Sequence, residues 1–292
     1  MVDDYPALRV EDMKGRPMRR VLLVLTGLML VSPATAADLD LDILHGLQPV
    51  GPATFTRWSG FYVGGQIGYS NGNADFSSAT RLGLAYALRE TTLENEFDVS
   101  QWPTLGTANQ TLPTFGGFIG YNTQWQDVVV GVEANINRAA LTLQAPSTPI
   151  GPLITAADSQ GYTHSVTISS SGSLTGGDFG SLRARGGYVI GNFMPYGFAG
   201  LALSNVSVAV ASNVVDNQCT TATPIVCARI PYSNSFNANA QMLYGIAAGG
   251  GVDWALTPNI FLRAEVEWDA FNAPPGMLLT MATGRLGAGF KF

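Results

Sequence analysis

Long apolar runs are missing from this chain, although 46% of its 292 residues are hydrophobic. No stretch reaches the roughly 18 or more apolar residues that a membrane-spanning helix needs, so the sequence excludes a helical membrane protein. Charged residues are also few, at 12%. After residue 36 the only lysine is Lys291, which is unusual for a soluble domain with a solvated, charged surface.

Histidine and cysteine are almost absent. His45 and His164 are the only histidines, and neither stands at the spacing of a metal site or of a nucleophile with its base. We therefore expect no enzyme activity, no metal site and no cofactor. The only cysteines, Cys219 and Cys227, lie close together in a Thr-, Ser- and Asn-rich stretch. In an oxidising compartment they would form a local loop disulfide, with two free thiols as the alternative.

Five of the 15 basic residues and four of the 21 acidic residues precede residue 37, which leaves 10 bases and 17 acids after it. An acidic chain repels phosphate backbones, so nucleic acid is not expected as a partner. Glycine is abundant, with 34 residues, and Phe, Trp and Tyr together make up 10% of the chain. This composition favours many short strands over helices.

Residues 1–36 have the pattern of a secretory signal peptide. A basic stretch from Lys14 to Arg20 precedes an apolar run, residues 21–31, and Ala34-Thr35-Ala36 supplies the small residues of a cleavage site. A buried core helix is the alternative. We expect cleavage after Ala36, followed by a periplasmic leader, residues 37–57, whose role the sequence leaves open.

Alternation of apolar with polar or small residues recurs in eight later segments, each long enough to cross a bilayer as a tilted strand. Residues 260–269 show it most clearly, since they read IFLRAEVEWD, with one apolar and one charged face. The eight segments are about 58–70, 113–125, 128–143, 176–190, 194–210, 239–256, 259–271 and 280–292.

Alternation alone does not distinguish a soluble barrel, with its apolar face inside, from a membrane barrel, with that face outside. The connections between the segments run about 42, two, 32, three, 28, two and eight residues, so long and short links alternate. Outer-membrane barrels have this asymmetry, with long loops outside the cell. We therefore predict an all-β fold: an eight-stranded antiparallel up-and-down transmembrane barrel over residues 58–292, with extracellular loops at about 71–112, 144–175 and 211–238.

The interior of an eight-stranded barrel is only wide enough for side chains to fill. The charged faces of the predicted strands carry nearly balanced numbers of acids and bases, which we expect to pair across this interior. The predicted interior network consists of Glu133, Arg183, Arg185, Arg263, Glu265, Glu267, Asp269, Arg285 and Lys291.

Aromatic residues are expected to form girdles at the two membrane interfaces, since they cluster near the ends of the predicted strands. Aromatic packing in a soluble core is the alternative. The predicted girdles contain Trp58, Trp125, Phe193, Tyr196, Trp254 and Phe292 at the short-turn end, and Tyr69, Phe115, Trp268 and Phe271 at the opposite end.

A series of ordered motifs resembles the successive strands of the outer-membrane immunogenic protein family, a porin-like group of small OmpA-like barrels. The resemblance covers most of residues 58–292 and is weakest in the first long loop and in the cysteine-containing loop. Its motifs are Trp58–Tyr69, Gly116–Trp125, Val130–Ala134, Ser181–Tyr188, Pro195–Gly200, Leu262–Glu265 and Arg285–Phe292.

The resemblance implies a Gram-negative outer-membrane surface protein, in contact with lipid and lipopolysaccharide. It also implies that Phe292, with Phe290, is read by the barrel-assembly machinery. We predict a structural, surface-exposed role with a largely closed interior, and the simplest oligomeric state is a monomer. Porin-like diffusion of small solutes is the first alternative. The second is binding through the long loops, for instance of haem, to which His164 and Tyr162 could contribute ligands, or of a host or environmental partner.

Overall fold

The computed structural model describes residues 56–102, 105–145 and 149–292. The predicted signal peptide, residues 1–36, lies outside the described residues. All of the predicted leader, residues 37–57, lies outside them as well, except for its last two residues.

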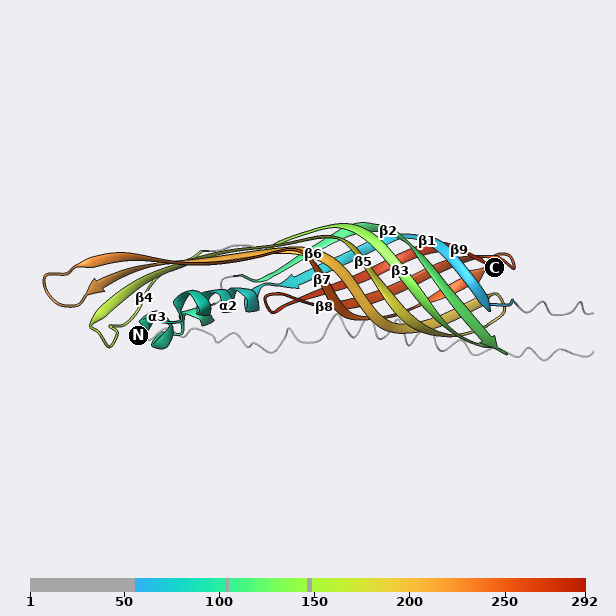
Figure 1. Ribbon diagram of the computed structural model, residues 1–292, viewed down its shortest axis with the longest axis horizontal. Helices are drawn as coiled ribbons and strands as arrows, with labels where there is room; N and C mark the ends of the chain where they lie inside the picture. Colours follow the sequence, from blue (N-terminus) through green and yellow to red (C-terminus); the bar gives the residue numbers. More distant parts are fainter. Residues whose placement is uncertain (1–55, 103–104, 146–148) are drawn as a thin grey trace, which may run out of the picture. The chain divides into compact units, whose positions relative to one another are not determined.

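Strands make up most of the described chain (Figure 1). None of the helices in the described part is long and apolar enough to cross a membrane. The helices are α2 (Ser77–Leu88), α3 (Thr92–Asn95) and the 3-10 helix η1 (Val99–Gln101). The strands are β1 (Gly60–Asp75), β2 (Thr107–Trp125), β3 (Val128–Ala145), β4 (Ile150–Ile154), β5 (Tyr162–Tyr188), β6 (Phe193–Thr220), β7 (Cys227–Ala255), β8 (Ile260–Ala273) and β9 (Met277–Lys291).

Eight of these strands close into a ring. They pair in the order β3-β2-β1-β9-β8-β7-β6-β5, and β5 pairs back onto β3. All of these pairings are antiparallel, and β4 joins only β5, away from the ring. The predicted eight-stranded antiparallel barrel is therefore confirmed. Closure leaves no strand edge unpaired within the ring.

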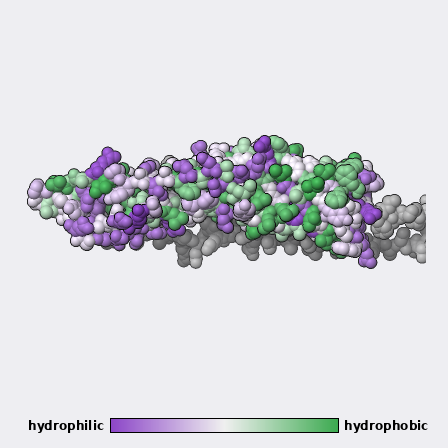
Figure 2. Space-filling model, viewed as in Figure 1, coloured by the Kyte–Doolittle hydropathy of each residue, from purple (hydrophilic) through white to green (hydrophobic). Residues whose placement is uncertain are grey.

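The barrel wall is apolar outside, and its inner side carries aromatic, polar and, toward the arm, aliphatic side chains. In β1, Phe61, Ile67 and Tyr69 are exposed on the outer surface, while Tyr62 and Gln66 are buried inside. Figure 2 shows hydrophobic residues gathered over the barrel strands. The outward apolar stretch of β1 runs over residues 61–69, which matches the roughly 9–11 residues that a tilted strand needs to cross a bilayer. The apolar face of the wall is thus the one suited to lipid.

Three strands continue beyond the barrel as an extension that we call the arm. It consists of β4 with residues 162–175 of β5, 207–220 of β6 and 227–241 of β7, and it carries α2, α3 and η1 (Figure 1). At ~3.3 Å per residue, its part of β5 is about 45 Å long. Much of segments 144–175 and 211–238, for which we predicted loops, therefore forms paired strands.

A sparse apolar alternation explains why these two segments are strands. In the arm, Val166, Ile168 and Val214 are buried on one face of the sheet, and Ser, Thr and Asn predominate on the other. The helices formed by the first predicted loop, 71–112, cover the apolar face with Leu84 and Leu88, among others. Burial of these aliphatic side chains, at about 1.5–3 kcal/mol each, stabilises pairing that Ser-rich strands alone would not hold.

Candidate functional site

The barrel interior is filled in layers, which β8 displays in order along one face. Phe261 lies at the end with the short turns 126–127, 189–192 and 256–259, which we call the short-turn end. Arg263, Glu265, Glu267 and Asp269 follow, all buried. Toward the arm the lining becomes apolar. That layer includes Ala74, Leu112, Leu141, Phe179, Ala202, Leu243, Phe271, Leu279 and Met281.

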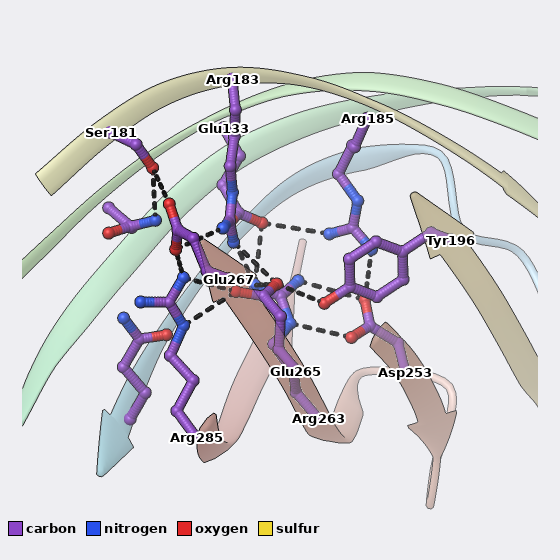
Figure 3. Close-up of polar contacts among 12 residues, drawn as sticks. Glu133, Ser181, Arg183, Arg185, Tyr196, Asp253, Arg263, Glu265, Glu267 and Arg285 are labelled. Carbon is purple, nitrogen blue, oxygen red and sulfur yellow. Dashed lines mark hydrogen bonds and ion pairs between the residues drawn. The ribbon is translucent and has the colours of Figure 1, made fainter. Parts of the chain in front are cut away.

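Glu133 lies at the centre of the charged layer (Figure 3). Its Oε1 is 2.5 Å from Arg183 Nη2, and its Oε2 is 3.0 Å from Arg185 Nη1 and 2.9 Å from Arg263 Nη1. The Tyr62 hydroxyl donates to Oε2 at 2.7 Å. One carboxylate thus serves three guanidiniums, because β3, β5 and β8 direct alternate side chains toward the barrel axis.

Asp253 is a second shared carboxylate that we did not predict. Its Oδ1 accepts from Arg263 Nε at 2.8 Å, and its Oδ2 accepts from Arg185 Nη2 at 2.7 Å. The signal was present in the sequence, since Val252 and Trp254 alternate with Asp253 and lie on the outer surface. With Asp253 included, the interior holds five acids and five bases.

Glu265 and Glu267 complete the network on the side toward the arm. Arg183 donates to Glu265 at 2.7 Å and to Glu267 at 3.0 Å. Arg285 Nε donates to Glu265 at 2.8 Å and also contacts Glu267. Tyr196 donates its hydroxyl to Glu265 at 2.5 Å. Charge-assisted bonds of this kind are about twice as strong as neutral ones, so the network links several strands across the interior.

Aromatic rings hold the guanidiniums in place. The Arg183 guanidinium carbon lies 3.9 Å from the ring centre of Phe198, and that of Arg185 lies 3.8 Å from the ring centre of Tyr196. The flat guanidinium stacks on a ring and still directs its N–H groups in the plane toward carboxylates. The aromatic and charged layers therefore form one packed unit.

Asp269 and Lys291, both predicted in the network, are buried in the interior but form no ion pair with another described residue. Asp269 Oδ2 has no hydrogen-bond partner within the described residues. Lys291 Nζ donates to the Arg57 carbonyl at 3.1 Å and lies 4.0 Å from the ring centre of Trp58. Lys291 thus closes the short-turn end rather than pairing with an acid.

Most of the predicted girdle residues are exposed on the outer surface. Trp125, Trp254 and Phe292 lie at the short-turn end, as does Phe193, which stacks on Trp254 with ring centres 5.7 Å apart. Tyr69, Phe115 and Trp268 are exposed nearer the arm.

Trp58, Tyr196 and Phe271 are corrections to the girdle prediction, because all three side chains are buried inside the barrel. Tyr196 and Phe271 occupy inward positions of the strand alternation. Trp58 precedes β1 in phase with the inward Tyr62 and packs against Phe261, with ring centres 5.9 Å apart. Nearness to a strand end does not decide whether an aromatic side chain faces the lipid or the barrel interior. Alternation along the strand decides it, because successive residues point to opposite sides of the wall.

The end of the arm is fastened covalently. Cys219 and Cys227 are paired across β6 and β7 and joined by a disulfide. The connection between these strands, residues 221–226, lies directly beyond that bond. A short loop closed in this way stiffens the end of the hairpin locally and leaves the barrel unaffected.

His164 is buried in the arm between two carboxylates. Its Nδ1 lies 2.7 Å from Asp216 and its Nε2 lies 3.2 Å from Asp158, and the side chain is only 2% exposed. Both ring nitrogens are therefore occupied, so this arrangement presents no nitrogen to haem iron. The geometry contradicts our suggestion that His164, with Tyr162, supplies haem ligands. Among the described residues, no group of three or more His, Cys, Asp and Glu side chains is placed to hold a metal ion.

Asp158 and Asp216 make the stability of the arm depend on pH, and the direction of each effect follows from the shift in the pKa of the carboxyl group. Burial raises the pKa of Asp158, but hydrogen bonds from the Tyr162 N–H and from His164 outweigh this and hold it below the usual 3.8. Asp158 therefore stabilises the arm above pH 3.8, and this is lost as the pH falls further. Burial raises the pKa of Asp216, so its ionisation destabilises the arm at neutral pH.

We expect amide hydrogen-exchange protection in the arm, corrected for intrinsic rates, to rise modestly as the pH falls from 7 and then to fall below about pH 3.8. The Asp158→Asn variant should lose the decline at low pH, while protection in the barrel strands stays constant. A decline of equal size in the variant would show that another group is responsible.

Comparisons with known proteins agree with the geometry. No family model matches the chain. The 25 kDa outer-membrane immunogenic protein of Brucella ovis is 24% identical over 278 residues, which cover 95% of this chain and all of that protein. The chain is a homologue of that outer-membrane protein. It lies in the outer membrane of a Gram-negative bacterium, as we predicted.

Solved structures similar to this outer-membrane barrel include Neisserial surface protein A, with a TM-score of 0.35, 17% identity and coverage of 80% of this chain and 98% of that one. Ail of Yersinia pestis has a TM-score of 0.31 and 13% identity, with 80% and 99% covered. OprG of Pseudomonas aeruginosa has a TM-score of 0.31 and 12% identity, with 80% and 96% covered.

Proposed function

We propose that this barrel is a structural membrane anchor with a closed interior, and that its function is to display the arm outside the cell. The observation that supports this most is the filling of the interior by three consecutive layers: aromatic, charged and apolar. The charged layer is nearly electroneutral, and all of its carboxylates except that of Asp269 are bonded to guanidiniums, so a passing ion would find few unpaired charges. Passive diffusion, the porin-like alternative, requires a continuous wet path that these layers interrupt.

Conductance tests the closed interior. Purified protein inserted in planar lipid bilayers should produce no discrete current steps above the membrane baseline, because solutes would have to displace both the ion pairs and the apolar layer. An open porin inserted under the same conditions serves as the positive control. Reproducible steps from protein free of contaminating porins would support the alternative instead.

Display outside the cell is tested on intact bacteria. A short protease site placed in residues 221–226, at the end of the arm, should be cleaved by added protease, and one placed in the short turn 256–259 should not. Cleavage of the turn site alone would reverse the orientation of the barrel. The contacts of the described residues give no reason to propose an enzymatic activity.

Outer-membrane lipid surrounds the barrel. The outward Phe290 and Phe292 rings pack together with centres 5.1 Å apart at the end of the chain. We keep the proposal that these two residues form the signal read by the barrel-assembly machinery. The further proposals are that lipopolysaccharide contacts the outer part of the wall and that the barrel works as a monomer, since the closed ring satisfies its own backbone groups.

A further inference from the structure

One face of the arm sheet is exposed. The helices pack against the even-numbered side chains of β5, such as Val166 and Ile168, so the odd-numbered side chains lie on the opposite face. There β5 presents Ser169, Ser171 and Ser173, of which the first two are exposed and the third is partly exposed. Helices in the described part of the chain thus cover one side of the arm and leave a hydroxyl-rich side open.

The strand register aligns these hydroxyls with polar side chains of neighbouring strands. Directly paired residues of an antiparallel sheet point to the same side, with strands ~4.8 Å apart. The rows that cross the exposed face therefore contain one residue from each strand. Two adjacent rows are Ser171–Ala211–Ser235 and Gln144–Ser173–Ala209–Asn237.

The face is hollowed where these two rows cross β6. Ala209 and Ala211 are the shortest side chains in the rows, and longer polar side chains flank them on both sides. The resulting depression has a volume of about 320 Å³ and is lined by residues of β3, β5, β6 and β7. Its walls offer hydroxyl and amide groups, and its base offers methyl groups.

Charge is nearly absent from this face. Of the side chains that β5, β6 and β7 direct to it within the arm, only Arg229 is ionised, and it lies near the disulfide-bonded end. An anionic ligand would need bases, and an apolar partner would need an apolar surface. Hydroxyl and amide groups both donate and accept hydrogen bonds, as the hydroxyls of sugars do, while the alanine methyls can contact the C–H groups of a sugar ring.

We infer that this depression binds a neutral glycan. Its occupant is a chain of uncharged sugars, the material that a surface arm meets in the polysaccharide around a bacterial cell. The inference rests on the proposed display of the arm outside the cell. Glycan binding by purified protein does not depend on how the barrel is oriented in the membrane. Loss of glycan binding would therefore contradict this inference alone, whereas absence of protease cleavage on intact cells would contradict the proposed display.

The test uses the full mature chain, refolded in detergent, and affinity electrophoresis in gels containing dextran, mannan or galactan, with heparin as the anionic comparison. At least one neutral polysaccharide should retard the wild type. The Ala209→Glu/Ala211→Glu variant, which fills the depression with charge, should bind at least tenfold more weakly. Asn213→Glu/Asn217→Glu adds the same two charges to the same strand and face outside the depression and should bind like the wild type.

A second variant shows whether weak binding by the first variant could result from misfolding. Ser173→Ala/Asn237→Ala removes wall groups without adding volume and should also weaken binding severalfold, while the heat-modifiable mobility of the barrel stays unchanged. The inference is overturned if none of the three neutral polysaccharides retards the wild type, or if heparin alone does. It is equally overturned if folded variants keep full binding, or if retardation reflects self-association of the protein, measured by light scattering.

Discussion

Replacing Glu133 by Gln lowers the free energy of unfolding of the barrel by about 3–5 kcal/mol, the usual cost of removing one partner from a buried ion pair. The reason is the number of its partners, since Arg183, Arg185 and Arg263 all contact this carboxylate. Gln keeps the shape of the side chain but leaves three guanidiniums with one acid fewer. Reversible urea unfolding in lipid vesicles, followed by tryptophan fluorescence, measures the change.

Arg138→Gln is the matched control. Arg138 pairs with Asp178 at 2.9 Å on the outer surface, where both side chains are about half or more exposed. Such a pair contributes about 1 kcal/mol or less. A similarly small loss for Glu133→Gln would mean that the interior is well hydrated, and would weaken the case for a closed barrel. The double variant Glu133→Gln/Arg183→Gln should recover part of the free energy of unfolding that Glu133→Gln loses.

The other large loss of stability is expected when a charged side chain is placed on the outer face of the barrel wall. Leu286 is 64% exposed near the middle of the outward face of β9. In a bilayer, Leu286→Arg should destabilise the barrel by about 2–4 kcal/mol, as Arg does at the midplane of membrane barrels. The measurement is the same urea titration in lipid vesicles.

Leu82→Arg provides the comparison for that substitution. Leu82 is a similarly exposed leucine, at 56%, but it lies on α2, outside the barrel wall. We expect a change within about 0.5 kcal/mol, which is usual for surface positions. Equal effects at both positions would contradict the assignment of lipid to the outer face of the wall.

The barrel could be predicted from the sequence because the period of a strand is two, and each crossing repeats it several times. The run IFLRAEVEWD in β8 shows which residues share a face, and closure of the ring then brings those faces together. The same rule, applied to β7, would have found Asp253. Sequence position alone did not show which acid meets which base, because that depends on the stagger between strands.

The arm was missed for a different reason. Its strands alternate small and polar residues with a few aliphatic ones, and Ser, Thr and Asn in such numbers are typical of loops. Val166 and Ile168 become a buried face only once Leu84 and Leu88, distant in the sequence, pack on them. That contact is tertiary, so local periodicity did not reveal it.

β5, β6 and β7 each continue from the wall into the arm as one strand, with a register shift near the junction in the β5–β6 and β6–β7 pairings. This continuity restricts how the arm can change in length. Removing one residue from each strand would move every side chain of the arm strands to the opposite face of the sheet. The serines would then face the helices, and the valines would face water. Removal of two would keep each side chain on its side. Without a further bulge, evolution or protein engineering can therefore change the length of the arm only in even steps, of about 6.6 Å each.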